Sequence, residues 1–393
     1  MTDVSETKKP GDRKITRLAD LTASQQADIR QIPAEKDFVN VPLAAERPNG
    51  IFTGRDRFDA EQTGVFHRFP VPVTLAAVLP EPGSVVAVEA YGLPLLVSRN
   101  RAGEIKVFIN ACQHKGSKLI EDCEVHEQSR ITCPYHAWTY GIDGKLLGVA
   151  RSDMFEGLDK SKRGLKQLPS VVWGGVVYVQ LDGREPDCSN LSAEVAGDFE
   201  ALGIPEAHVY GRKTFDLKAN WKLVLEPFLE GYHVQRLHAA SIGDLFVDAP
   251  SIVSTFGPNI RQVSGRIGYY PEMLDEDPDN NVHKLVTFAY TAFPNLVIVT
   301  SQYYISAMIL MPIDVDRTIV HYFMLTPGPA TTAKAEEVFK RSYELILNVF
   351  GNEDFRAAQI THEGLAAGVP ETSTYCGLEV NIIHYYEAFE QLL

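Results

Sequence analysis

Short apolar runs with strand-like character fill the chain between about residues 69 and 181. They are separated by Pro-Gly, Arg-Asn-Arg-Ala-Gly and Asp-Gly sequences, which favour turns. Short strands at this spacing are typical of a small all-β domain. The expected strands lie at residues 84–90, 93–99, 104–111 and 175–181.

The pattern changes after residue 182, where helix-like segments precede longer apolar runs. Helices that pack against a mainly antiparallel sheet form an α+β domain. The predicted fold class is therefore α+β, an all-β domain joined to a second domain of antiparallel sheet flanked by helices. We expect helices at 191–202 and 221–237, strands at 285–293, 296–311 and 318–327, and a helical region from about 333 to 365.

The N-terminal segment 1–60 is polar, with an expected helix at 23–32 and an expected loop at 47–57 that is rich in Pro, Gly and Arg. It is interpreted as an arm for subunit contact. The predicted division is an arm at 1–60, the all-β domain at 61–185 and the second domain at 186–393.

Charge narrows the range of partners. The chain has 37 Lys and Arg residues and 51 Asp and Glu residues, which gives a net charge of −14. This negative charge opposes binding to nucleic acid or to an anionic membrane surface. A polar N-terminus and the lack of about 18 consecutive apolar residues favour a cytoplasmic protein. In that compartment the five cysteines stay reduced unless a metal holds them.

Two Cys-His pairs carry the first chemical signal. Cys112 and His114 form a C-x-H arm, and after the intervening loop 115–132 Cys133 and His136 form a C-x-x-H arm. A zinc finger would place its cysteines together in one arm, whereas one Cys and one His per arm suit a Rieske [2Fe-2S] cluster. A zinc site or a chance pairing is the alternative. The remaining cysteines lack such partners and are expected to be ordinary thiols: Cys123, Cys188 and Cys376.

A second signal is the spacing Glu230-x-x-His233-x4-His238. Two imidazoles and one carboxylate form the facial triad of non-haem Fe(II) oxygenases. Residues five apart lie about 140° apart around an ideal helix, so the two imidazoles converge only if the helix distorts or ends between them, as at a π-bulge. The alternative is two satisfied histidines in a half-buried helix.

Residues 85–181 resemble the Rieske domain of the aromatic ring-hydroxylating oxygenases, α subunit, and the remainder resembles their catalytic domain. The resemblance implies a terminal oxygenase with a [2Fe-2S] cluster and a mononuclear Fe(II). Such an enzyme takes electrons ultimately from NAD(P)H, through a separate reductase or ferredoxin, and uses O₂ to hydroxylate an aromatic or hydrophobic small molecule by mono- or dioxygenation. Two departures from the family pattern are Cys123 in a long inter-arm loop and Ala137 where glycine is usual.

The resemblance also supplies the third iron ligand. The stretch GNEDFRAAQITHEGLAAG resembles the family helix that carries the carboxylate ligand, which places Asp354 in that role with Glu353 as the alternative. His362 replaces a usual glutamine there. It is either a residue behind the ligands or a helix-surface histidine, and we expect the latter.

Glu230 stands where most family members carry aspartate. By resemblance, this carboxylate bridges His233 to a Rieske histidine of a neighbouring subunit in a head-to-tail trimer, with or without a β subunit. Glutamate at this position occurs in a branch that includes quaternary-ammonium oxygenases. An oxidative demethylase or a quaternary-ammonium monooxygenase is therefore the alternative function. An electron-transfer protein with an inactive second half is disfavoured by Glu230, His233 and His238.

Apolar residues beyond the histidine pair are candidates to line a substrate cavity. Arg236 could meet a substrate carboxylate, but a surface ion pair is the expected role. The cavity candidates are Phe228, Phe246, Phe288, Tyr290, Phe293, Leu296, Ile298 and Met308.

Overall fold

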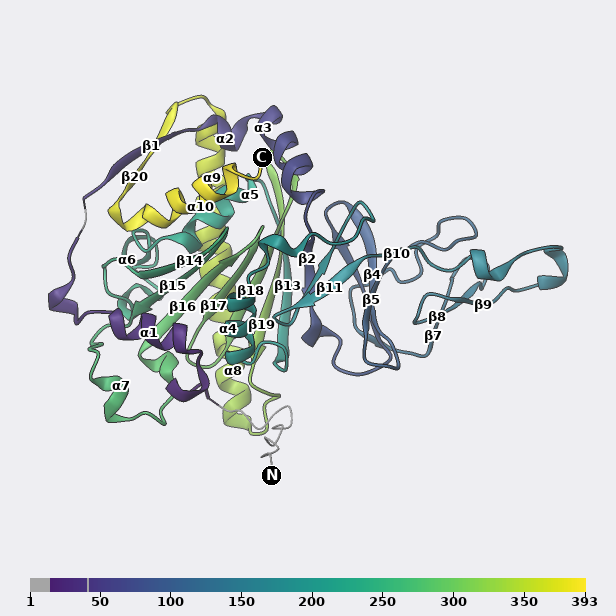
Figure 1. Ribbon diagram of the computed structural model, residues 1–393, viewed down its shortest axis with the longest axis horizontal. Coiled ribbons are helices and arrows are strands. Elements are labelled where there is room, and N and C mark those ends of the chain that lie inside the picture. Colours follow the sequence, from purple (N-terminus) through teal and green to yellow (C-terminus); the bar gives the residue numbers. More distant parts are fainter. Residues whose placement is uncertain (1–14, 41) are drawn as a thin grey trace. The chain divides into compact units, whose positions relative to one another are not determined.

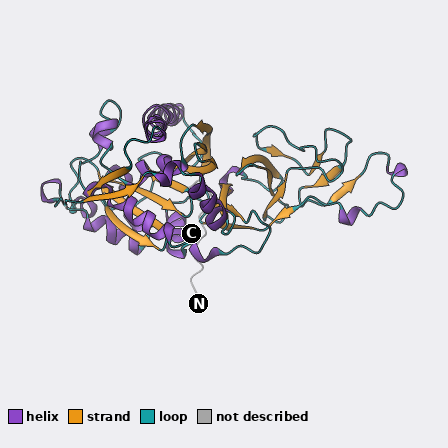
Figure 2. Cartoon of the chain, turned by 90° about the horizontal axis from the view of Figure 1, so that it is seen from above, coloured by secondary structure: helices purple, strands orange, loops and turns teal. Residues whose placement is uncertain are grey.

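The computed structural model describes residues 15–40 and 42–393, and it divides the chain into two compact units (Figures 1 and 2). One unit is Phe66–Cys188, and the other combines the chain up to Val65 with Ser189–Leu393. The sequence set the segment 1–60 apart as an arm, whereas its described part clusters here with the C-terminal part. The three-part division stays a proposal about which segments fold on their own. Along the described ranges, no helix is both long and apolar enough to cross a membrane.

The unit Phe66–Cys188 is built of antiparallel sheets. Their strand orders are β10-β5-β4-β3-β6, β11-β12-β2 and β7-β8-β9. The four strands expected in this region from apolar runs are present as β3, β4, β5 and β12. The strands are β2 (Val71–Leu75), β3 (Ser84–Ala90), β4 (Leu93–Arg99), β5 (Ile105–Ile109), β6 (His126–Glu127), β7 (Arg130–Thr132), β8 (Thr139–Gly141), β9 (Leu146–Gly148), β10 (Gln167–Leu168), β11 (Ser170–Trp173) and β12 (Val176–Val179).

The other unit is organised around one antiparallel sheet of order β13-β19-β18-β17-β16-β15-β14, called the large sheet below. The single strand expected at 296–311 is wrong. It is a hairpin that turns at residues 301–304, a stretch without the Gly or Pro that usually marks a turn. The strands are β13 (His208–Leu217), β14 (Ile252–Phe256), β15 (Asn259–Gly265), β16 (Val286–Ala292), β17 (Leu296–Thr300), β18 (Ile305–Asp314) and β19 (Arg317–Thr326).

Helices pack on both faces of the large sheet. The loop expected at 47–57 is wrong, because Pro48 ends an edge strand, β1, that pairs with β20, and α2 and α3 follow at once. The helices are α1 (Ala23–Gln31), α2 (Gly50–Thr53), α3 (Arg55–Glu61), α4 (Ala193–Ala201), α5 (Trp221–Leu225), α6 (Val234–Leu237), α7 (Met273–Glu276), α8 (Ala333–Asn348), α9 (Phe355–Ala366) and α10 (Val380–Glu390), and the edge pair is β1 (Ala44–Pro48) with β20 (Thr372–Cys376).

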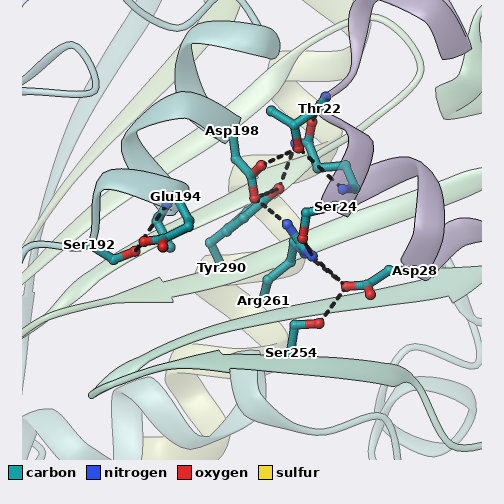
Figure 3. A network of polar contacts seen from close by, with 11 residues as sticks. Thr22, Ser24, Asp28, Ser192, Glu194, Asp198, Ser254, Arg261 and Tyr290 are labelled. Carbon is teal, nitrogen blue, oxygen red and sulfur yellow. Dashed lines mark hydrogen bonds and ion pairs between the residues drawn. The ribbon is translucent and has the colours of Figure 1, made fainter.

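One face of the large sheet is tied to α1 and α4 by a buried arginine (Figure 3). Arg261 on β15 is fully buried and donates to Asp198 of α4 at 2.5 Å and to Asp28 of α1 at 2.9 Å. The hydroxyl of Tyr290 on β16 donates to Asp198 at 3.2 Å. A buried guanidinium is tolerated when carboxylates compensate its charge. Arg261 and Tyr290 therefore mark the sheet face that α1 and α4 cover.

The opposite face of the same sheet is covered by the segments around η8 (Glu226–Leu229) and α10. Gln262, the residue after Arg261, donates its side-chain amide to the carbonyl of Phe228 in η8 and accepts from Asn381 of α10 at 3.0 Å. Neighbouring residues of a strand point to opposite faces. Gln262 therefore marks the second face of the sheet. We call this face, which η8 and α10 cover, the near face.

Candidate functional site

The two Cys-His arms form two similar loops. Cys112 and Cys133 are both 3% exposed, and the carbonyl of each closes a turn by accepting from a backbone N–H four residues later. The donors are Gly116 at 2.8 Å and Ala137 at 3.0 Å. Both donors have left-handed backbones, with φ of +80° and +55°. Ala137 adopts this conformation at a cost of roughly 1 kcal/mol, which explains why glycine suits the position better.

The imidazoles of the two arms lie together. The rings of His114 and His136 have centroids 4.7 Å apart, and His114 stacks on Trp138 at 4.9 Å. Nδ1 of His114 is buried and has no hydrogen-bond partner among the described residues. Desolvation lowers the pKa of His114, and the nearby His136 and Lys115 lower it further. The neutral ring, which is the form that binds metals, is therefore favoured.

Tyr140 connects the thiol pair to the fold. Its hydroxyl lies 3.3 Å from Sγ of Cys112 and accepts from the backbone N–H of Gln113 at 2.9 Å. Because it accepts there, its own proton is available to the sulfur. Two buried sulfurs and two imidazoles, one with a ring nitrogen that no described residue contacts by a hydrogen bond, fit the ligand set of a [2Fe-2S] cluster with two thiolates and two histidines.

The second site is built around one short helical turn. α6 begins directly after His233 and ends directly before His238, so the helix expected at 221–237 is interrupted. His238 leaves the helical conformation with φ −93° and ψ 18°. The two ring centroids are 5.0 Å apart. The helix ends between the two histidines, and no π-bulge is required there.

Asp354 reaches the two histidines from the C-terminal region. It ends η11 (Val349–Asp354), a π-helical segment between α8 and α9, and it is 2% exposed. Its Oδ1 lies 3.4 Å from Nε2 of His233 and 3.2 Å from Nε2 of His238. One ligand atom from each of these three residues falls within 4.8 Å of the others.

A carboxylate lies behind each of the two imidazoles. Glu230 contacts Nδ1 of His233 and accepts its backbone N–H at 3.1 Å. Glu353 lies 2.5 Å from Nδ1 of His238 and accepts from the hydroxyl of Ser241 at 2.7 Å. Glu353, the alternative third ligand, is thus placed behind His238. An ionised carboxylate only accepts, so each Nδ1 carries the proton and each Nε2 presents a lone pair.

In the neutral form of each ring the Nε2 atom presents a lone pair, so the two Nε2 atoms and Oδ1 of Asp354 form a set of three converging acceptors. Oδ1 of Asp354 is buried and receives no hydrogen bond from the described residues. Burial lowers the pKa of His238, whereas Asp354 and Glu353 raise it, and the net direction is upward. A positive charge stabilises such a buried set of acceptors, and it can be a proton on His238 in the metal-free protein or a metal ion when one is bound. Two imidazoles and one carboxylate are the ligand set of mononuclear non-haem Fe(II).

Two other polar residues singled out in the sequence have partners other than the three converging ligands. His362 is only 7% exposed, and its Nδ1 accepts from the backbone N–H of Asn220 at the start of α5, so the expected helix-surface position is wrong. Arg236 forms an exposed ion pair with Asp248 at 2.9 Å, as expected.

Six of the eight cavity candidates can be assigned to one of the two sheet faces. Residues directly opposite one another on neighbouring strands share a face. Tyr290 pairs with Arg261 on the face that α1 and α4 cover, so the residues in register with this pair lie away from the iron ligands. The cavity role is wrong for these residues: Phe288, Tyr290, Leu296 and Ile298. On the near side are Phe228 in η8 and Met308, which pairs with Tyr322 beneath η11.

Sequence reasoning missed Glu226, which no motif singles out. Its carboxyl is buried and accepts from the hydroxyls of Tyr375 at 3.0 Å and Tyr386 at 2.7 Å. Burial raises the pKa of Glu226 to about 7, the two tyrosines lower it, and the charges of Glu379 and Glu230 raise it again. The segment that leads to Glu230 therefore contains an acid that ionises near neutral pH.

Glu226→Gln is expected to stabilise the protein at pH 8 and not at pH 4.5. The unfolded carboxyl ionises near 4.5 and the folded one near 7, so the stability of the wild type falls as pH rises across this window. Above it the loss is roughly 3 kcal/mol. The measurement is the urea midpoint of both proteins at several pH values. Glu336→Gln is the matched control, because exposed Glu336 also accepts from a tyrosine, Tyr210. Equal pH dependence in wild type and Glu226→Gln would contradict this assignment.

Residues 69–159 match the family model of the Rieske [2Fe-2S] domain, and residues 204–393 match that of the ring hydroxylating alpha subunit, catalytic domain. The two models cover separate parts of the chain, in the order that the sequence predicted. The predicted combination of a Rieske domain and a catalytic domain is confirmed.

Relatives of known activity include dioxygenases and monooxygenases. The chain is 33% identical over 196 residues to the anthranilate 1,2-dioxygenase large subunit of Acinetobacter baylyi, which is 48% of this chain and 41% of that protein. The matches to this relative and to glycine betaine monooxygenases span less than half of those proteins. The carnitine monooxygenase oxygenase subunit of Acinetobacter pittii is 23% identical, covering 84% of this chain and 88% of that protein.

Solved structures share the fold. A quaternary ammonium Rieske monooxygenase superposes with a TM-score of 0.75 at 19% identity, covering 88% of this chain and 94% of that one. Naphthalene 1,2-dioxygenase from a Rhodococcus species gives a TM-score of 0.70 at 20% identity with the same coverage. The fold class predicted from the sequence is thereby confirmed.

Proposed function

Because the chain belongs to the family of Rieske-type oxygenase α subunits, we propose that it is the terminal oxygenase of a multicomponent system. It takes electrons from NAD(P)H through a separate reductase or ferredoxin and uses O₂ to hydroxylate an aromatic or hydrophobic small molecule. A location in the cytoplasm, where reduced nicotinamides are available, goes with this role.

One observation carries the proposal: the convergence of Asp354 Oδ1 with the Nε2 atoms of His233 and His238. In our assignment these three residues hold Fe(II), and the thiols and imidazoles of Cys112, His114, Cys133 and His136 hold the [2Fe-2S] cluster. When bound, the cluster supplies electrons singly and the Fe(II) supplies the place where O₂ is activated for hydroxylation of a carbon.

Two carboxylates of the protein orient the histidines that would hold the iron. Glu230 and Glu353 keep the Nδ1 protons on the two ligand histidines and fix their ring planes. We further propose that Glu230 is the link from His233 to a Rieske histidine of a neighbouring subunit, in a head-to-tail homotrimer with or without a β subunit. Its contact with His233 through both the ring and the backbone N–H supports this role.

A quaternary-ammonium monooxygenase is the second candidate. It is supported by the glutamate at position 230 and by the carnitine monooxygenase subunit, which aligns with most of this chain. Catabolism of an aromatic compound is supported by the match to the anthranilate dioxygenase subunit. The two candidates share the iron site and differ only in the substrate.

Turnover with a generic reductase distinguishes them. The purified protein is incubated with NADH, O₂ and a panel of aromatic acids, polycyclic hydrocarbons and N-methyl compounds, and the products are identified by mass spectrometry with ¹⁸O₂. Incorporation of ¹⁸O into an aromatic product supports the first candidate, and release of an N-methyl group supports the second. Failure to incorporate oxygen into any compound, despite a loaded cluster and iron, contradicts the oxygenase proposal.

A further inference from the structure

Arg266 is a half-buried arginine without an acidic partner among the described residues. Its Nε is buried and donates no hydrogen bond to any of them, and its guanidinium contacts the hydroxyl of Thr287, at 3.4 Å, and the ring of Phe246, at 5.6 Å. Burial lowers its pKa. Arg236 and Arg261 are instead paired with carboxylates. In a chain with an excess of acids, an uncompensated arginine is unusual.

The strand register places this guanidinium on the near face of the large sheet. Thr287 pairs with Ser264, which lies two residues from Gln262 on the same strand. Residues two apart share a face, so Thr287 and Gln262 point to the side covered by η8. Arg266 follows β15 directly and contacts Thr287 from that side.

Arg266 is also connected to the turn that carries the iron ligands. It forms an antiparallel bridge with Phe246, whose carbonyl accepts from the side chain of Gln235 at 2.9 Å. Gln235 lies on α6, between His233 and His238. Phe246, over whose ring the Arg266 guanidinium lies, is therefore hydrogen-bonded to α6, the turn between His233 and His238.

The two contacts seen do not offset the cost of removing a guanidinium from water. A long hydrogen bond to a neutral hydroxyl and a cation–π contact together stabilise the guanidinium by less than the desolvation of an unpaired charge costs. An arginine fork is suited to bidentate binding of a carboxylate. A group that costs stability in the free protein is typical of a binding site.

We propose that Arg266 binds the carboxylate of the substrate, so that the enzyme acts on organic acids in preference to their neutral analogues. This inference rests on the proposed oxygenase function and narrows its substrate class. The guanidinium forms the ion pair, Thr287 fixes its plane, and Phe246 covers its face. The charge holds one end of the molecule, and the oxidised carbon lies elsewhere on it.

Equilibrium binding tests the proposal without turnover. The probes are benzoate, 2-aminobenzoate and trimethylammonioacetate, each compared with its amide by titration calorimetry on the metal-loaded protein under nitrogen. We expect at least one acid to bind wild type at least tenfold more tightly than its amide, and Arg266→Met to remove this preference. Arg266→Lys should retain part of it. Arg317→Met, which removes an exposed pair with Asp216, is the control and should keep the preference.

Melting temperature supplies a second readout. If the role of Arg266 is to bind substrate, the Arg266→Met variant should melt at the same temperature as wild type or at a higher one. The reason is that the substitution removes a half-buried charge that no carboxylate compensates in the free protein. A lower melting temperature with an unchanged acid-to-amide ratio would overturn the proposal in favour of a structural role. It would also be overturned if no acid bound wild type, or if amides bound as well as acids. Failed oxygenation with an intact acid preference would count against the oxygenase function alone.

Discussion

Asp354→Ala is expected to remove iron from the mononuclear site and to abolish product formation, while the [2Fe-2S] cluster remains. Among the described residues Asp354 is the one anion at the convergence of acceptors, and two neutral imidazoles hold Fe²⁺ poorly in a buried place. Metal analysis should therefore show iron falling from about three atoms per chain to about two, with acid-labile sulfide unchanged.

The same substitution is expected to stabilise the metal-free protein. Oδ1 of Asp354 receives no hydrogen bond within the described part of the chain, so the apoprotein carries a buried carboxylate whose charge is incompletely compensated. Asp216→Ala, which removes an exposed carboxylate on β13, is the matched control and should leave iron at its wild-type level. Full iron occupancy in Asp354→Ala would show that another residue is the third ligand, and Glu353 would be tested next.

Much of this fold was predictable because its signals are local. The strands β3, β4, β5 and β12 follow from apolar runs with Gly, Pro or Asp between them, and the two Cys-His arms both lie in the short stretch from Cys112 to His136. Spacing also indicated that His233 and His238 share a site only where a helix is broken. These predictions needed no knowledge of distant contacts.

The wrong predictions concern features that tertiary packing determines, namely the sheet face that a residue joins and the position of a turn. Nearly every residue of β16 is buried, since both faces of the large sheet are covered there. Period-2 alternation then carries no information about which face a residue joins, so the apolar residues of β16 and β17 could not be assigned to the cavity. The turn at 301–304 has no Gly or Pro and forms because the flanking strands pair.

The different roles of the adjacent acids Glu353 and Asp354 could not be predicted from the sequence either. Glu353 and Asp354 are neighbours in sequence, but the π-helical register of η11 sends one behind His238 and the other toward both Nε2 atoms. A regular helix would turn the two side chains differently. Resemblance to the family suggested Asp354 as the ligand, and the role of Glu353 had no signal in the sequence.

Glu230→Gln and Glu353→Gln form a pair of variants that separates two roles of a carboxylate. Each removes the charge behind one ligand histidine and keeps the side-chain shape, so a charge-assisted hydrogen bond becomes a neutral one of about half the strength. We expect each variant to bind iron roughly 10- to 100-fold more weakly. Anaerobic titration of the iron-depleted proteins with Fe²⁺, in competition with a chelator, measures this loss, and the cluster absorbance serves as the internal control.

The two variants should differ once iron is saturating. Glu353 is held by Ser241 within its own chain, so excess iron should restore most of the product formation in Glu353→Gln. In our proposal Glu230 also links His233 to the cluster of a neighbouring subunit, and added iron cannot replace that link. Glu230→Gln should therefore remain nearly inactive with a full iron site, and its reduced cluster should reoxidise slowly in a single turnover with substrate and O₂. Equal recovery of both variants would mean that Glu230 only orients His233, and the route between the two metal centres would have to run through other residues.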